Sequence, residues 1–143
     1  MTSPFQNPPD AEIADRLRHS QTVAVIGVSP DRSRPSHGVA AALDRLGYQV
    51  TGVRPGTDRI RDFPVVPELA ALPDSVDLAV VFRRHEHAGE VVDQALEAAV
   101  PALWFQEGAG EALAARRARE AGLFVVMDRC IYRDGIPLLQ AGA

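Results

Sequence analysis

Short apolar segments alternate with amphipathic segments along most of the chain, and this alternation constrains the fold more than any other feature. Five segments are short, apolar and mostly rich in β-branched residues, a pattern typical of strands buried on both faces of a parallel sheet. The predicted strands cover residues 23–28, 48–53, 78–82, 102–105 and 123–127.

The segments between these strands carry the spacing of helices with one apolar face. Val39, Ala42, Leu43 and Leu46 follow the i, i+3, i+4, i+7 pattern, and Gly47 is a typical residue just past a helix end. Prolines interrupt the connection between the second and third strands, which leaves room for one short helix there. The predicted helices cover residues around 13–17, 39–46, 68–72, 86–99 and 111–121.

Strands that alternate with helices require crossover connections, which place strands in parallel and helices on both faces of the sheet. We therefore predict an α/β fold, a Rossmann-like parallel sheet of about five strands with helices on both faces. The length of 143 residues fits one domain. We expect a loose N-terminal tail at residues 1–10 and a single domain at 11–143. Ligands of such sheets bind beyond the carboxyl ends of the strands, where the strand order reverses.

Composition excludes several classes of function. Apolar runs reach only about six residues, too few to cross a bilayer, and the N-terminus has no signal-peptide pattern, so we expect a cytoplasmic protein without membrane contact. A net charge of −4 argues against a nucleic-acid partner. All fifteen basic residues are arginine, which excludes a P-loop lysine and Schiff-base chemistry. A lone cysteine, Cys130, predicts neither a disulfide nor a zinc site.

The turn after the first predicted strand combines groups that favour phosphate. It is too long and too poor in glycine for the G-x-G-x-x-G dinucleotide motif. It offers arginines, serine hydroxyls and the start of a helix, where backbone N–H groups lack partners. The candidate ligand-binding residues in this segment are Gly27, Val28, Ser29, Arg32, Arg34, Pro35 and Ser36. The alternative interpretation is a capped helix behind a solvated loop.

Arginine also follows other predicted strands. Arg54 stands where an NAD-binding domain carries a carboxylate for the ribose, and it is followed by Pro55. A guanidinium there suits a phosphorylated ribose, which both NADP and coenzyme A (CoA) contain. Four of the five strand ends are followed closely by arginine, which predicts a docking edge for a polyphosphorylated ligand. These arginines are Arg32, Arg34, Arg54, Arg83 and Arg129.

The remaining polar residues predict no catalytic or metal site. The turn that begins with Gln106 either lines the opposite wall of the crevice or is a plain loop, and Glu107 and Asp128 have no spacing that fixes them as an acid/base pair. His85 and His87 are best interpreted as surface residues rather than metal ligands. Cys130 is interpreted as a small apolar residue, although a thiol there could also form a mixed disulfide with a thiol ligand.

Five motifs in order resemble those of the small single-domain bacterial CoA-binding proteins. They lie within residues 21–132 and end the predicted strands with V-A-V-I-G-x-S, V-R-P, V-F-R, W-x-Q-x-G and V-V-M-D-R-C. That family is similar to the CoA-binding domain of the succinyl-CoA synthetase α subunit and of ADP-forming acyl-CoA synthetases. The family usually carries Asn before the proline of the second motif, so Arg54 is a departure.

The resemblance implies CoA as the ligand, with the loop from Gly27 to Ser36 around its phosphates. It places Arg54 and Pro55 beside the adenosine, with Phe82, Arg83 and Gln106 flanking the pantetheine or the nucleotide. The larger synthetases add a phosphorylated histidine domain and an ATP-binding partner that this chain does not resemble.

We therefore expect non-catalytic binding of CoA or an acyl-CoA. The alternatives are an NADP-dependent oxidoreductase, which shares the fold and suits Arg54, and a protein-interaction domain with an empty crevice. The sequence leaves homo-oligomerisation and the choice between free CoA and a thioester open.

Overall fold

The computed structural model describes residues 5–141 and contains one sheet with the strand order β3-β4-β2-β1-β5-β6-β7. Neighbouring strands are parallel except β3 and β4, which are antiparallel. The predicted α/β fold with a parallel sheet is confirmed. The strands are β1 (Thr22–Ile26), β2 (Gln49–Val53), β3 (Arg59–Ile60), β4 (Phe63–Val66), β5 (Leu78–Val81), β6 (Ala102–Phe105) and β7 (Phe124–Met127).

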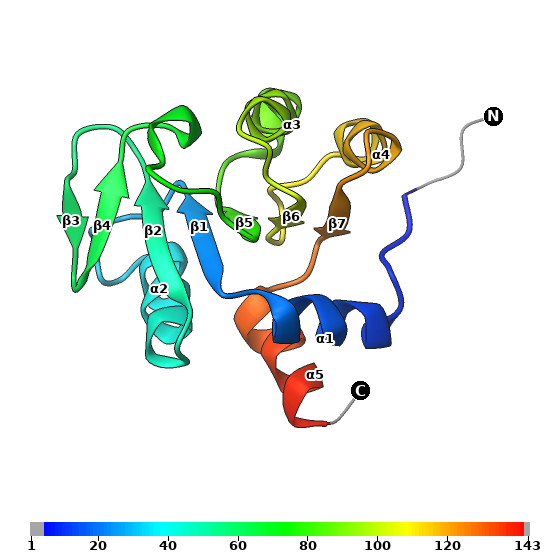
Figure 1. Cartoon of the computed structure of the whole chain (residues 1–143), viewed down its shortest axis with the longest axis horizontal. Helices are drawn as coiled ribbons and strands as arrows, with labels where there is room; N and C mark the ends of the chain where they lie inside the picture. The colour runs from blue at the N-terminus through cyan, green and yellow to red at the C-terminus, as the bar shows by residue number, and fades with distance from the viewer. Residues whose placement is uncertain (1–4, 142–143) are drawn as a thin grey trace.

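Helices cover both faces of the sheet, as the sequence predicts. Figure 1 shows α1, α2 and α5 on one face and α3 and α4 on the other. They are α1 (Asp10–His19), α2 (Pro35–Arg45), α3 (Ala88–Glu97), α4 (Ala112–Glu120) and α5 (Ile136–Gln140), with 3₁₀ turns at Leu69–Ala71 and His85–His87 and a π-helical turn at Ile131–Gly135. No helix within residues 5–141 is long and apolar enough to cross a bilayer.

The central strands are apolar throughout because both of their faces are buried. Val23 and Val25 of β1 belong to the apolar core under α1, α2 and α5, whereas Ala24 and Ile26 belong to the core under α3 and α4. Successive strand residues point to opposite faces, so a strand between two helix layers has no solvent-facing side chains. Trp104 of β6 is the largest fully buried residue and lies in the first core.

Two strands, β3 and β4, lie in the proline-rich connection where the sequence predicts only a short helix. Phe63 and Val65 of β4 are buried, whereas Pro64 between them is exposed. Proline is tolerated in strands near a sheet edge, and here it pairs with Arg59 of the two-residue edge strand β3. The predicted helix at 68–72 is reduced to the 3₁₀ turn at Leu69–Ala71.

The described part of the expected N-terminal tail lies against β7. The Asn7 side chain donates a hydrogen bond to the Met127 carbonyl (2.8 Å) and accepts one from the Met127 amide (2.8 Å). The guanidinium of Arg119 stacks 4.1 Å from the centre of the Phe5 ring. Asn7 and Phe5 therefore attach this segment to β7 and α4. Residues 1–4 of the predicted tail lie outside the described residues.

The order of strands creates a point of divergence beside β1. Its neighbours are β2 on one side and β5 on the other, so the connections after β1 and β5 leave the sheet in different directions. In open parallel sheets, this divergence opens a crevice beyond the carboxyl ends of the strands. A ligand site is therefore expected just beyond Ile26 and Val81.

Candidate functional site

A hollow of about 340 Å³ lies at this point of divergence. The residues that line it follow three different strands. They meet because parallel strands end at the same edge of the sheet. The hollow is lined by Gly27, Val28, Arg54, Pro55, Phe82, Arg83, Arg84 and His87. Six of these were candidates from the sequence alone; Arg84 and His87 were not.

Gly27 is required by the close approach of β1 and β5. Its φ of +82° is one that other residues rarely adopt, and a Cβ built there would lie 2.4 Å from the Phe82 carbonyl oxygen. On either side of this contact, the Gly27 amide donates to Val53 and the Phe82 amide donates to Ile26. The absence of a side chain thus lets the ends of β1, β2 and β5 converge on the hollow.

The loop between β1 and α2 is held by its own hydrogen bonds. Ser36 Oγ accepts from the Ser29 amide (3.0 Å), and Ser29 Oγ accepts from the Asp31 amide (3.1 Å). Asp31 Oδ1 in turn accepts from the amide (2.9 Å) and hydroxyl (2.8 Å) of Ser33. These bonds from Ser33 hold the pKa of the Asp31 carboxyl below its ordinary value. The loop therefore has a defined shape in the absence of a ligand.

Because the loop forms these internal hydrogen bonds, the loop and the helix start offer fewer free N–H groups than the sequence predicts. Helix α2 begins at Pro35, which has no N–H, and the amides of His37 and Gly38 both donate to the Arg34 carbonyl. Within the first turn of α2, only the Ser36 amide donates no hydrogen bond to any residue in 5–141. Side chains, rather than main-chain donors, supply most of the attraction for an anion here.

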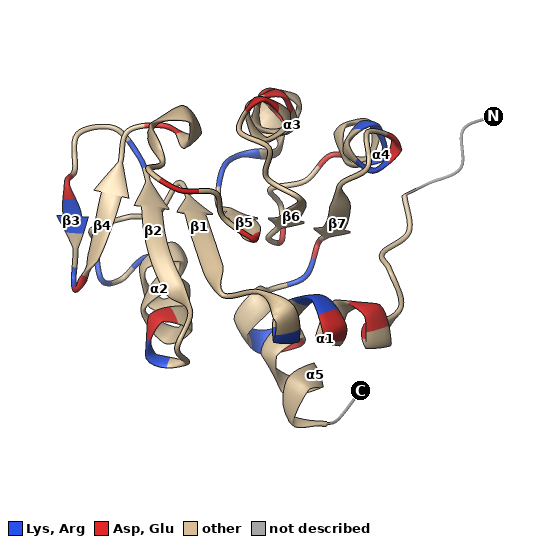
Figure 2. Ribbon diagram, in the orientation of Figure 1, with Lys and Arg blue, Asp and Glu red and all other residues tan. Residues whose placement is uncertain are grey.

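The guanidinium groups near the hollow are largely without partners. Those of Arg32, Arg34 and Arg83 form no hydrogen bond or ion pair with any residue in 5–141. Arg54 donates to the Val28 carbonyl (3.3 Å) and to the Pro55 carbonyl (3.5 Å), so only neutral acceptors hold it. In Figure 2, basic residues mark the segments that follow β2 and β5. Two carboxylates act on this group: Glu86 forms an ion pair with Arg84 of the lining (3.2 Å), and Asp31 interacts electrostatically with Arg34. Arg32, Arg54 and Arg83 form no ion pair with a carboxylate in the part of the chain that the structure describes, so net positive charge remains at this edge.

Two predicted site residues are engaged elsewhere. Arg129 forms an ion pair with Asp10 of α1 (2.9 Å), because the chain after β7 turns toward α1 rather than toward β1. Gln106 is buried, and its Oε1 accepts from the Ile131 amide (2.8 Å). Neither residue lines the hollow. Arg129 follows a strand at the predicted edge, but its guanidinium is paired with Asp10 and does not belong to the group around the hollow.

The other polar candidates lie outside the hollow or contribute no reactive pair to it. Glu107 forms an ion pair with Arg133, and Asp128 is exposed, so no bond joins the two carboxylates. His85 is exposed, whereas His87 is half-buried and lies 3.6 Å from Glu90. The place of His87 in the hollow comes from the 3₁₀ turn after β5, which the sequence pattern does not reveal.

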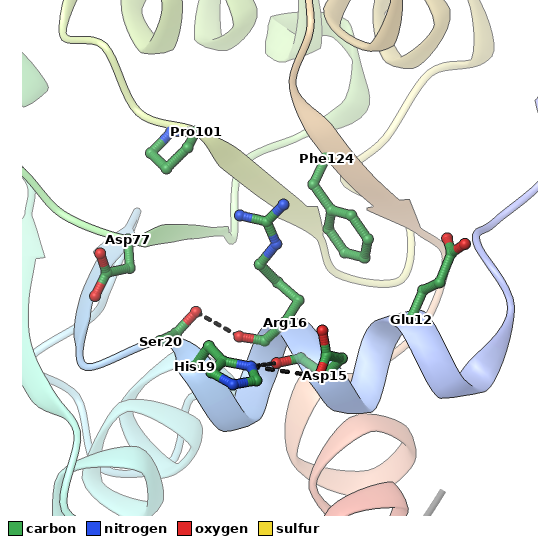
Figure 3. A pocket seen from close by; sticks show the side chains of 8 residues that line it. All are labelled: Glu12, Asp15, Arg16, His19, Ser20, Asp77, Pro101 and Phe124. Atoms are coloured by element: carbon green, nitrogen blue, oxygen red, sulfur yellow. Dashed lines mark hydrogen bonds and ion pairs between the residues drawn. The ribbon is translucent and has the colours of Figure 1, made fainter.

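A larger hollow, of about 410 Å³, lies at the opposite edge of the sheet (Figure 3). There the Arg16 guanidinium stacks 4.8 Å from the centre of the Phe124 ring, among the carboxylates of Glu12, Asp15 and Asp77. Bonds from the Gln21 and Thr22 amides lower the pKa of Asp77. Its carboxylate thus caps β1 and leaves an acidic surface unsuited to phosphate. The carboxyl edge is therefore the better candidate site for an anionic ligand.

Comparison with known proteins gives matches along nearly the whole chain. The chain is 36% identical over 127 residues to the uncharacterized protein YneT of Bacillus subtilis, covering 89% of this chain and 94% of that protein. A solved structure of a hypothetical protein from Pyrococcus horikoshii superposes with a TM-score of 0.88 at 29% identity, covering 97% and 98% of the two chains.

A shorter match names an activity for the relative. The chain is 33% identical over 67 residues to an ADP-forming acetate–CoA ligase of Archaeoglobus fulgidus, a stretch that covers 47% of this chain and 10% of that enzyme. The model of the family described as "CoA binding domain" matches residues 21–135, which include every strand and the whole hollow. The chain therefore belongs to the family of CoA-binding domains.

Proposed function

We propose that this protein binds CoA or an acyl-CoA at the carboxyl edge of the sheet without transforming it. The observation that carries the proposal is that four of the five guanidinium groups around the hollow beside β1 form no ion pair with a carboxylate of residues 5–141, whereas the fifth, that of Arg84, is paired with Glu86. Arg83 and Arg54 come from different strands and line the same space, and Arg32 and Arg34 extend from the neighbouring loop. An otherwise acidic chain concentrates positive charge at the site where this sheet type binds ligands.

Each part of the ligand has candidate contacts. Arg32, Arg34 and the Ser36 amide suit the phosphates, and Arg54 with Pro55 suits the phosphorylated ribose of the adenosine. Phe82 offers an apolar surface, and Arg83 lies beside it. Gln106 is buried, holds the Ile131 amide with its Oε1 and does not line the hollow, so we assign it no contact with the ligand.

The lining of the hollow supports binding rather than catalysis. Its side chains include no hydroxyl, thiol or carboxylate, and the imidazole of His87 has no second reactive group beside it in the lining, so the hollow holds no pair of nucleophile and base. The relative that is a ligase is far longer than this chain, which matches only 10% of it. The family match gives no support to the alternative of an NADP-dependent oxidoreductase.

Titration calorimetry with CoA, dephospho-CoA and NADP tests this function. We expect CoA to bind and dephospho-CoA to bind more weakly by about 1.5–3 kcal/mol, which is roughly tenfold to 150-fold, because a charge-assisted contact to the 3′-phosphate is lost. Arg54→Gln should weaken CoA binding and reduce that preference. Equal affinity for both ligands in the wild type rejects the 3′-phosphate contact, and absence of binding rejects the proposed function. Tighter binding of NADP than of CoA favours the oxidoreductase.

A further inference from the structure

His37 is a buried polar residue to which the site described above assigns no role. It is the third residue of α2 and only 5% exposed. Its Nδ1 lies 3.0 Å from the Ser29 carbonyl oxygen. Because a carbonyl oxygen can only accept, Nδ1 carries the hydrogen. Nε2 is buried and has no hydrogen-bond partner among the described residues. The imidazole therefore uses one nitrogen and leaves the other unsatisfied.

Ser36 and His37 together hold both polar groups of the Ser29 backbone. Ser36 Oγ accepts from the Ser29 amide, while His37 Nδ1 donates to the Ser29 carbonyl, and both distances are 3.0 Å. We call this arrangement the Ser29 clamp. A buried nitrogen without a partner opposes folding, and such groups are rare in native proteins unless they serve another need. An apolar side chain at position 37 would avoid this penalty but would release the Ser29 carbonyl.

The Ser29 clamp is linked to the hollow through the chain on both sides of Ser29. Val28, the preceding residue, lines the hollow, and its carbonyl accepts from Arg54 Nη1 (3.3 Å). On the other side, Ser29 Oγ accepts from the Asp31 amide, at the start of the segment that carries Arg32 and Arg34. A shift of Ser29 thus moves three of the guanidinium groups assigned to the ligand.

We propose that His37 is a positioning residue for anion binding: it fixes the β1–α2 loop through Ser29 and so places the arginines before the ligand arrives. This inference rests on the proposed function for its ligand. Preorganisation raises affinity because the loop does not have to be ordered on binding. His37 itself does not touch the ligand, since its side chain is buried behind the loop and does not line the hollow.

Two substitutions separate positioning from packing. His37→Asn keeps an N–H donor close to the position of Nδ1 and replaces the unsatisfied Nε2 by a carbonyl oxygen, whereas His37→Leu removes both nitrogens at similar size. We expect His37→Leu to weaken CoA binding roughly threefold to tenfold, the effect of one lost hydrogen bond, and His37→Asn to stay within roughly twofold of the wild type. Thermal unfolding checks that both variants fold.

His19→Leu is the matched control. His19 Nδ1 also lies at hydrogen-bond distance from a main-chain carbonyl, that of Asp15 (2.8 Å), but at the exposed end of α1 beside the opposite edge of the sheet. We expect this variant to bind CoA as the wild type does.

Amide hydrogen exchange gives a second readout that needs no ligand. Exchange at residues 29–33 should be faster in His37→Leu than in the wild type and unchanged in His37→Asn. Wild-type affinity and exchange in His37→Leu, or equal losses in the Asn and Leu variants, overturn the role of His37. If the wild type does not bind CoA, the proposed function fails, while the exchange rates still decide whether the Ser29 clamp holds the loop.

Discussion

The two halves of the carboxyl edge differ in how many of their arginines are paired with carboxylates. Beside β1, β2 and β5, the guanidinium groups of Arg32, Arg34 and Arg83 have no ion-pair partner within residues 5–141, and only that of Arg84 is paired there, with Glu86. Beside β6 and β7, Arg129 is paired with Asp10, and Arg133 with Glu107 and Asp134. An arginine after a strand therefore does not by itself mark a binding site. We infer that the half with fewer ion-paired arginines is the one that attracts an anion.

The β6–β7 half is closed by side-chain bonds to the main chain. Trp104 Nε1 donates to the Arg129 carbonyl (2.7 Å), and Gln106 Oε1 accepts from the Ile131 amide. Asp134 Oδ2 accepts from the Cys130 amide (2.8 Å). Together these bonds hold the π-helical turn at Ile131–Gly135 against the strand ends. One half of the edge is built for stability, and we infer that the other is kept open for a ligand.

Gly27 lies where the ends of β1 and β5 approach each other, and a side chain there should lower stability more than any other change proposed here. Gly27→Ala introduces a Cβ against the Phe82 carbonyl at a φ that disfavours alanine, so we expect it to lower the free energy of unfolding by about 2–5 kcal/mol. Urea unfolding followed by circular dichroism measures this. Gly38→Ala is the control, because a Cβ at this helical position meets no atom within 4 Å; it should be neutral or stabilising by up to about 1 kcal/mol. Wild-type stability of Gly27→Ala contradicts the close approach.

Removal of one arginine from each half should affect ligand binding differently. Arg83→Gln should weaken CoA binding by about 1.5–3 kcal/mol, because an unneutralised charge beside the ligand is lost. Arg133→Gln should leave the affinity unchanged, since Glu107 and Asp134 already neutralise that guanidinium. Calorimetry on the two variants and the wild type measures the difference. Equal losses in both variants would show that the whole edge contributes to binding.

A substitution at Gln106 tests what keeps the β6–β7 half closed. Gln106→Leu leaves the buried Ile131 amide without its acceptor, so we expect the free energy of unfolding to fall by about 1–3 kcal/mol. Gln94→Leu is the matched control, because Gln94 makes only a long bond to Glu90 on the surface of α3 (3.4 Å); it should change stability by no more than about 0.5 kcal/mol. Denaturant unfolding measures both variants. A neutral Gln106→Leu would show that the bond to Ile131 does not close this half.

The smallest effect is a dependence of stability on pH in the closed half. Bonds from Arg133, and then from the Cys130 amide, lower the pKa of Asp134. A carboxyl with a lowered folded-state pKa stabilises the fold above its ordinary value of 3.8, and this contribution is lost as the pH falls through the folded-state value. Asp134→Asn should therefore destabilise the protein at pH 7 but much less at pH 2, as measured by thermal unfolding. An equal effect at both pH values would contradict this assignment.

The sequence predicts the parts of this structure that depend on local pattern. The runs around Val25 and Val80 indicate strands buried on both faces because nearly every residue in them is apolar. The strands β3 and β4 are not predicted, because they depend on pairing with a neighbouring strand and carry no strand pattern of their own. Phe63 and Val65 alternate with Pro64, which by itself indicates a break.

The sequence predicts those residues of the candidate site whose positions depend only on where a strand ends. Gly27, Arg54 and Arg83 meet because parallel strands share an edge. The state of each arginine depends on distant residues: Asp10 lies 119 positions from Arg129 in the chain, and no pattern in the sequence joins them. The buried role of His37 is likewise set by the folded loop, and only its place in the first helical turn is visible in the sequence.

Titration of ¹⁵N-labelled protein with CoA, followed by amide chemical shifts, shows which half of the edge holds the ligand. Saturable shifts should concentrate in residues 27–36, 54–55 and 82–84, with little change at Glu107, Arg133 or the acidic hollow around Asp77. Shifts centred on the β6–β7 half or on that acidic hollow, or no saturable shifts at all, would contradict the claim that the unneutralised arginines hold the ligand.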